Sequence, residues 1–336
     1  MKPSSMRSAL AALAVALATC PAFGTLIQGT MSNFDVFNET GTNVYGAEID
    51  LDGLHLGEVT KTYPAHFNNM TMTEYTSGST FGVKILFTDY NFTPGAPYIT
   101  PRIGQTTNGH FAVNLPGCEH FGFATSAQPT QTSYFWLDAA AARVGAAPLS
   151  IPMTTWNYVA PVGGNPGVMK AVLLPPKPPP ARDYPDAVWV KTFETEMSRG
   201  VDLEELISSP PSANGVAPQL PSEVEAEWEL MEWDNPMDRP DVPLADTDKS
   251  VVRRFEYYQY TGAYLDLSEG THLTNSAWIP GQAPPANELG QFIAANMVAA
   301  NLEAPAGVPE PSSALLILVS LCGLGCIPRR RSARCR

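Results

Sequence analysis

Four glutamates occupy every second position of one segment in the second half of the chain. They are Glu223, Glu225, Glu227 and Glu229. Because the residues between them are apolar, the alternation predicts a β-strand with the glutamates on one face, spaced about 6.6–6.8 Å apart. Carboxylates at this spacing repel one another, and Ca²⁺ would relieve the repulsion if other acids completed its shell of about six to eight oxygen ligands. We favour the alternative of a solvated strand face that discourages pairing with other strands, without a bound metal.

Tyrosines form the second candidate ligand site. Tyr257, Tyr258 and Tyr260 lie in the segment 251–260, which is also expected to be a strand. Exposed aromatic rings can stack on sugars, so these residues could bind carbohydrate. Aromatic side chains also fill sandwich cores, and alternation places Tyr257 on one face and Tyr258 and Tyr260 on the other. At least one of the two faces is therefore expected to be core.

No combination of residues predicts catalysis or a cofactor. The histidines lack metal-ligand spacing and are His55, His66, His110, His120 and His272. The acidic segments 50–53 and 246–248 resemble parts of calcium loops, but neither continues to the required glutamate, so we interpret both as turns. Nucleophile-elbow, phosphate-loop and dinucleotide motifs do not occur in the sequence. We expect no enzymatic activity. The alternative is a secreted carbohydrate-active enzyme, which would need two carboxylates flanking a sugar.

Short strands must position these residues. Alternating apolar residues predict strands at 34–38, 47–51, 81–87 and 168–174, and a hairpin of 121–123 with 133–137. The segment 289–302 fits a helix and a closing strand equally well. Short strands without a long helical period predict an all-β fold of one or two antiparallel β-sandwich domains, similar in fold to immunoglobulin or fibronectin domains.

A proline-rich stretch divides the expected body. Five of the six residues 175–180 are prolines, which favour a polyproline II strut. We expect a linker at 175–185 between a β-sandwich domain at 25–174 and a second β-rich domain at 186–304. The alternative is a surface loop within one larger sandwich.

The C-terminal segment 305–336 combines four features in a fixed order. Pro309, Glu310 and Pro311 precede an uncharged apolar run at 314–327, and a basic tail begins with Arg329, Arg330 and Arg331. The run is shorter than the roughly 20 residues of a typical transmembrane helix, and the arginines favour a cytoplasmic C-terminus. This order resembles the PEP-CTERM sorting signal of bacterial exported proteins. The resemblance implies that an exosortase processes the tail at the cell envelope, near extracellular polysaccharide.

The N-terminus is typical of a signal peptide. Lys2 and Arg7 precede the apolar helix-forming segment 9–18, and small residues at 22–24 provide a cleavage point. We therefore expect signal peptidase to remove residues 1–24. A lipoprotein signal ending at Cys20 is the alternative, but Thr19 fits that motif poorly. Cys118 is then the one cysteine of the body, and we interpret it as a buried small residue.

The charge of the body excludes one class of partner. The formal net charge of the whole chain is −13, and it becomes −19 without the two basic leader residues and without the five arginines and one glutamate from Pro309 onward. Nucleic-acid binding needs a basic surface and is excluded. We expect an exported protein, first held in the inner membrane and then at the cell surface or in the extracellular matrix. Its expected role is structural or adhesive, and a Ca²⁺-dependent binding module is a further alternative.

Overall fold

The computed structural model describes most of the body of the chain. The described residues are 27–92, 96–102, 117–145, 149, 151–159, 165–174, 187–207, 225–232, 237–238, 242–245, 247–263, 278–279 and 281–302. The expected signal peptide, the proline-rich linker and the sorting signal with its apolar run lie outside them. Among the described residues, no helix combines the length and apolarity needed to cross a membrane.

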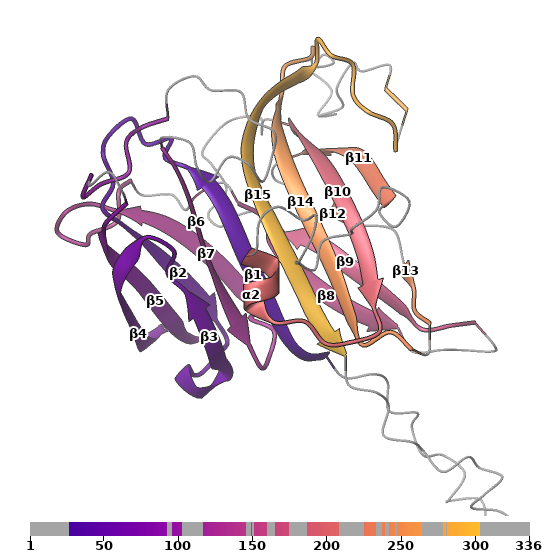
Figure 1. Cartoon of the computed structure of the whole chain (residues 1–336), viewed down its shortest axis with the longest axis horizontal. Coiled ribbons are helices and arrows are strands. Elements are labelled where there is room, and N and C mark those ends of the chain that lie inside the picture. The colour runs from indigo at the N-terminus through magenta and orange to yellow at the C-terminus, as the bar shows by residue number, and fades with distance from the viewer. Residues whose placement is uncertain are drawn as a thin grey trace, which may run out of the picture. The chain divides into compact units, whose positions relative to one another are not determined.

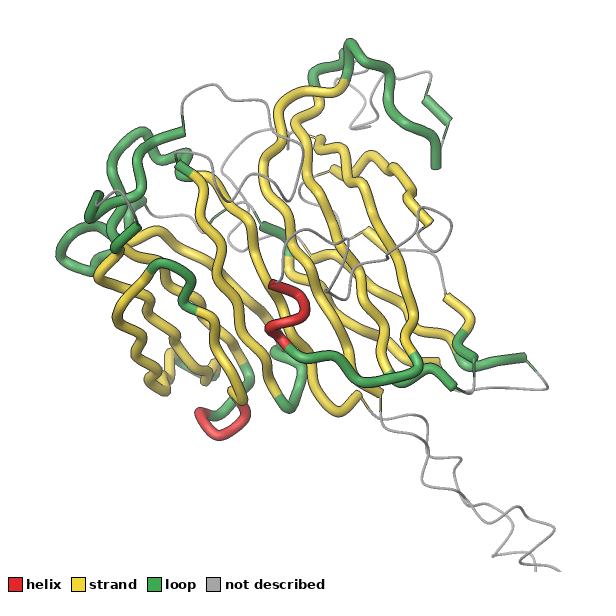
Figure 2. The backbone as a smooth tube through the Cα atoms, in the orientation of Figure 1, coloured by secondary structure: helices red, strands yellow, loops and turns green. Residues whose placement is uncertain are grey.

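The described strands are antiparallel and the largest sheet contains seven of them. Its order is β11-β10-β14-β15-β1-β6-β3 (Figure 1). These strands are β1 (Ile27–Phe37), β3 (Val59–Tyr63), β6 (Cys118–Thr125), β10 (Ala187–Met197), β11 (Glu225–Glu232), β14 (Ser250–Tyr260) and β15 (Leu289–Leu302). The short helix α2 (Leu203–Ile207) packs on this sheet against β1, β3 and β6 (Figure 2).

Two four-stranded sheets contribute to the same hydrophobic core as the seven-stranded sheet. The first has the order β4-β5-β2-β7, and in the second β9 pairs with β8, β12 and β13. Their strands are β2 (Gly46–Asp52), β4 (Phe67–Ser77), β5 (Thr80–Tyr90), β7 (Gln131–Leu137), β8 (Met153–Val159), β9 (Val168–Leu174), β12 (Met237–Asp238) and β13 (Val242–Pro243). The 3-10 turn η1 (Leu56–Glu58) follows β2.

Aromatic contacts join the seven-stranded sheet to the β4-β5-β2-β7 sheet. Phe34 of β1 packs on Tyr134 of β7 with ring centroids 4.3 Å apart, and Phe121 of β6 packs on Trp136 of β7 at 6.1 Å. All four side chains are buried. Burial of such rings contributes about 1.5–3 kcal/mol for each side chain, so this core accounts for much of the stability of the described body.

The expected division at the proline-rich segment is corrected by the strand pairing. β1 precedes that segment in the chain, β15 follows it, and the two strands pair from Ile27–Leu302 to Val36–Ala294. Residues 27–302 accordingly form one unit rather than the two expected domains at 25–174 and 186–304. One unit in place of two domains corresponds to the alternative left open by the sequence.

The expected hairpin of 121–123 with 133–137 is wrong. β6 pairs with β1 and β3 in the seven-stranded sheet, whereas β7 pairs with β2 in a different sheet. The intervening segment therefore connects two layers. The physical reason is that β6 has neighbours on both edges, which leaves no edge for β7.

The ambiguous segment 289–302 is a strand. β15 lies between β1 and β14, and both of its faces are mostly buried. Burial on both faces removes the polar half of the alternating pattern, so the sequence resembles a helical stripe as closely as a strand.

Candidate functional site

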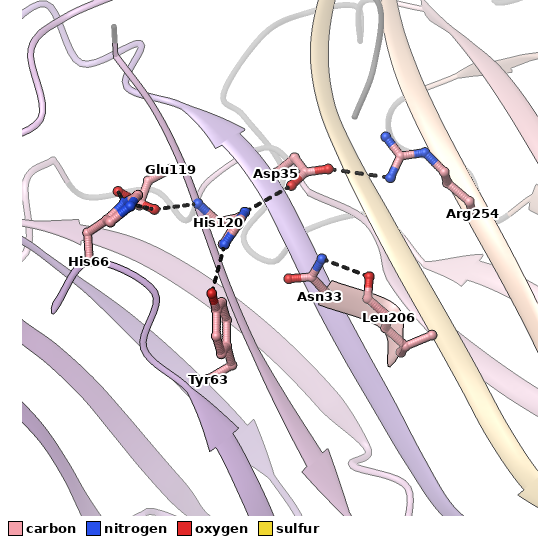
Figure 3. A network of polar contacts seen from close by, with 8 residues as sticks. All are labelled: Asn33, Asp35, Tyr63, His66, Glu119, His120, Leu206 and Arg254. Carbon is pink, nitrogen blue, oxygen red and sulfur yellow. Dashed lines mark hydrogen bonds and ion pairs between the residues drawn. The ribbon is translucent and has the colours of Figure 1, made fainter. Parts of the chain in front are cut away.

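A buried polar network crosses one face of the seven-stranded sheet (Figure 3). Asp35 of β1 lies directly opposite His120 of β6 in the strand register, and both side chains lie on the α2 face. The Arg254 guanidinium of β14 lies 3.4 Å from Asp35 Oδ2, and His120 Nδ1 lies 3.9 Å from Asp35 Oδ1. Only 1% of the Asp35 side chain and 5% of the Arg254 side chain are exposed. Such an enclosed pair is costly to desolvate and depends on close geometry.

Glu119 and His66 form the second part of this network (Figure 3). Glu119 is buried, and its two carboxylate oxygens lie 3.0 and 2.8 Å from His66 Nδ1. The His120 backbone N–H donates to the same carboxylate at 2.9 Å. The hydrogen bond to Glu119 raises the pKa of His66 above its usual value. Since His66 precedes β4 and Glu119 lies on β6, the contact ties together two sheets.

The contacts of this network join the elements that carry them. Burial and the nearby Glu119 raise the pKa of Tyr63, whose hydroxyl lies 3.3 Å from His120 Nε2, so the phenol stays protonated at neutral pH. The separation of 3.9 Å between His120 and Asp35 is that of an ion pair and too long for the hydrogen bond of a catalytic triad. Asn33 also donates to the Leu206 carbonyl of α2 at 3.4 Å. The network therefore orients helix and strands.

A second charged cluster lies on the outer face of the β4-β5-β2-β7 sheet. Along β2, Ile49 and Leu51 are fully buried in the core, so alternation places Glu48, Asp50 and Asp52 on the opposite face. We call the outward side chains around these three acids the carboxylate face. Lys84 of β5 is opposite Asp50 in the register, and Thr73 of β4 is opposite Lys84.

Two cations hold the acids of the carboxylate face. Arg143 follows β7, and its guanidinium donates to both Glu48 and Asp50, with 2.5 Å to Asp50 Oδ2. Lys84 Nζ lies 3.0 Å from Glu48 Oε1. Burial, and then the charge of Glu48, raise the pKa of Asp50 to about 6 despite these cations. The cations keep access to solvent, because 38% of the Arg143 side chain and 29% of the Lys84 side chain are exposed, whereas the Glu48 and Asp50 side chains are 4% and 15% exposed.

An aromatic ring completes the carboxylate face. Tyr75 of β4 is opposite Gly82 of β5, and its hydroxyl donates to Asp52 Oδ1. A Cβ atom at Gly82 would come within 2.9 Å of the Tyr75 Cζ, which shows that the ring crosses directly above this glycine. Packing of an aromatic ring over a strand glycine covers exposed backbone. Tyr75 itself stays half-exposed.

The predicted glutamate ladder is only partly as expected. The strand is present as β11, but Glu223 lies outside the described residues, and the side chain of Glu225 is not described. Glu227 and Glu229 are half-buried and share a strand face with the buried Met231, which belongs to the main core. The expected fully solvated face is therefore corrected, because the ladder lies on the face that the sheet turns toward the second layer.

The predicted tyrosine platform is mostly core. Tyr257 is fully buried and Tyr260 is 6% exposed, whereas Tyr258 is half-buried and donates to Glu256 at 2.8 Å. The register of β14 shifts around Tyr258, so the three rings do not form one open surface. Cys118 is buried as expected, and burial raises the pKa of its thiol.

Sequence reasoning missed the carboxylate face. Glu48, Asp50 and Asp52 alternate with apolar residues just as the later glutamates do, but the acidic segment 50–53 was interpreted as a turn. Strand β2 runs through Asp52, and the chain turns at Gly53, where φ is +78°. Within the part of the chain that the structure describes, no group of three or more His, Cys, Asp or Glu side chains is arranged to hold a metal ion.

Comparisons with protein-family models, with curated proteins and with solved structures find no match to this chain.

Proposed function

We propose that the chain is an exported protein of a bacterial cell envelope, sorted by an exosortase-type system and adhesive toward extracellular polysaccharide. The sorting part of the proposal depends on the order of Pro309-Glu310-Pro311, the apolar run 314–327 and the arginines from Arg329. Signal peptidase, exosortase and the membrane are the partners that this order implies. For the body we keep the proposal of a sandwich related to immunoglobulin or fibronectin domains.

The carboxylate face carries the adhesive part of the proposal. Sugar-binding surfaces present charged hydrogen-bonding groups next to a ring on which a pyranose can stack. The single observation that supports this role is that Asp50, Asp52, Lys84 and Arg143 surround the half-exposed ring of Tyr75 on one open sheet face. Because a sheet face is broad and flat, it suits a polymer better than a small molecule.

The experiment is a retention assay with two readouts. The protein produced from the full-length gene is incubated with matrix polysaccharide from the producing cells, and bound protein and new reducing ends are both measured. We expect retention without reducing ends. In the same cells, Glu310→Ala should leave unprocessed precursor in the membrane fraction. Absence of retention would contradict the adhesive role, and normal processing of Glu310→Ala would contradict the sorting role.

A polysaccharide hydrolase is the second candidate. A pKa of about 6 at Asp50, beside the carboxylate of Glu48, is the pattern expected for a general acid next to a second carboxylate. Arg143 bonds to both groups, which favours their ionised forms and disfavours this role. Reducing ends that form with the unchanged protein but not with Asp50→Asn would establish the hydrolase.

A further inference from the structure

The ring of Tyr75 is held in a fixed position on the carboxylate face. Its hydroxyl donates to Asp52, and the absence of a side chain at Gly82 leaves room for the ring to lie across the strand. One face of the ring then covers the sheet, and the residue remains partly exposed. A ring fixed in this way binds a ligand without losing further rotational freedom.

The groups around this ring carry surplus negative charge. Three carboxylates, Glu48, Asp50 and Asp52, face two cations, Lys84 and Arg143. Both cations bond to Glu48, and Arg143 also bonds to Asp50. The buried Asp50 Oδ1 atom has no hydrogen-bond partner. Burial and the hydrogen bond to Asp52 raise the pKa of Tyr75, and the negative charges of Asp50 and Asp52 raise it further. A positive charge brought beside Tyr75 would compensate both acids.

Ring and charge together select a class of ligand. An ammonium group is attracted both by the face of an aromatic ring and by carboxylates, and a sugar ring stacks on the same surface. The surplus charge of the face and the acidic body disfavour polymers of uronic acids or sulfated sugars. We propose that the carboxylate face binds a polymer of amino sugars that carry free ammonium groups, with Tyr75 as the stacking ring and Asp52 as the acceptor.

This inference rests on the proposed adhesive function and gives its ligand class. It is tested with the protein produced from the full-length gene and four defined probes, which are a glucosamine hexamer, its fully N-acetylated form, a glucose hexamer and a mannuronate hexamer. Acetylation removes the ammonium charge and keeps the sugar ring. We expect the glucosamine hexamer to bind at least about tenfold more tightly than its acetylated form. This factor is expected when one ammonium group of the ligand lies against an aromatic ring and a carboxylate.

Variants separate this site from general attraction to an acidic protein. Tyr75→Leu and Asp52→Asn should each weaken binding of the glucosamine hexamer by about tenfold. Glu204→Gln is the matched control, since it removes one exposed carboxylate from helix α2, which packs on the seven-stranded sheet. This variant should bind the glucosamine hexamer like the unchanged protein. Equal losses in Glu204→Gln and Asp52→Asn would overturn the site.

The remaining outcomes separate the two proposals. If the acetylated and free hexamers bind equally well and Tyr75→Leu weakens both, the ligand class is wrong while the adhesive role stands. Tighter binding of the mannuronate hexamer would likewise overturn the ligand class. If no hexamer binds and the matrix polysaccharide is not retained either, both proposals fail.

Discussion

The network of Figure 3 and the carboxylate face are built from the same kinds of side chains and differ in the access of their cations to solvent. In the network of Figure 3, the Asp35 and Arg254 side chains are 1% and 5% exposed. On the carboxylate face, Lys84 and Arg143 are 29% and 38% exposed. Enclosed charges can only pair with one another, whereas open charges can exchange a partner for a ligand. The same chemistry therefore gives rigidity in one sheet and a candidate binding surface in the other.

The largest expected effect comes from removing the central cation of each cluster. Arg254→Met should lower the free energy of unfolding by about 3–5 kcal/mol, because it leaves the buried carboxylates of Asp35 and Glu256 without that partner. Arg143→Met should cost only about 1–2 kcal/mol, since Glu48 keeps Lys84 at 3.0 Å. Urea unfolding at pH 7 measures both values. Equal losses would mean that the two clusters do not differ as described.

A smaller effect is expected from the His66–Glu119 contact as pH changes. The pKa of His66 is raised above 6.5, so the contact should contribute its full stability below about pH 6.5 and lose it as pH rises through the raised value. The loss should amount to about 1 kcal/mol, because solvent screens the partly exposed imidazole. His66→Gln should remove this part of the pH dependence in urea unfolding between pH 6 and 9. An unchanged profile in His66→Gln would show that another group titrates there.

The smallest effect on stability is expected at Asp50. Its pKa is raised from 3.8 to about 6, so its contribution to stability is fully present below about pH 3.8 and is lost as pH rises to about 6. Asp50→Asn should flatten this part of the profile and raise the stability at pH 7 by up to about 1 kcal/mol. A loss of several kcal/mol would instead place Asp50 in a network as essential as that of Arg254.

The sequence predicted most strands and few of their neighbours. Alternation located β1, β2, β5, β9, β11 and β14, because strands with one polar face keep a period of two. It misassigned β6 and β7 to one hairpin, since a short polar turn is compatible with a connection between layers as well as with a hairpin. It left β15 open, because a strand that is buried on both faces loses the alternation.

The charged sites were predicted less well, for a similar reason. The alternating acids Glu48, Asp50 and Asp52 are visible in the sequence. Whether such acids form ion pairs or bind a ligand depends on cationic side chains that are distant along the chain. Arg143 lies 95 residues from Glu48, and Arg254 lies 219 residues from Asp35. Only the sheet register brings these side chains together. For the same reason, the sequence could not tell that the strand face of Glu227 and Glu229 turns toward the core.

The most direct test of the central claim places the same substitution on both sides of one strand. Thr73 and Thr76 are both exposed on β4. Thr73 lies in one row with Lys84 and Asp50 of the carboxylate face, whereas Thr76 has the opposite orientation. Thr73→Arg should reduce retention on matrix polysaccharide by about tenfold, with a melting temperature within about 4 °C of the unchanged protein. Thr76→Arg should be retained like the unchanged protein. Equal retention of the two variants would contradict the assignment of the carboxylate face as the binding surface.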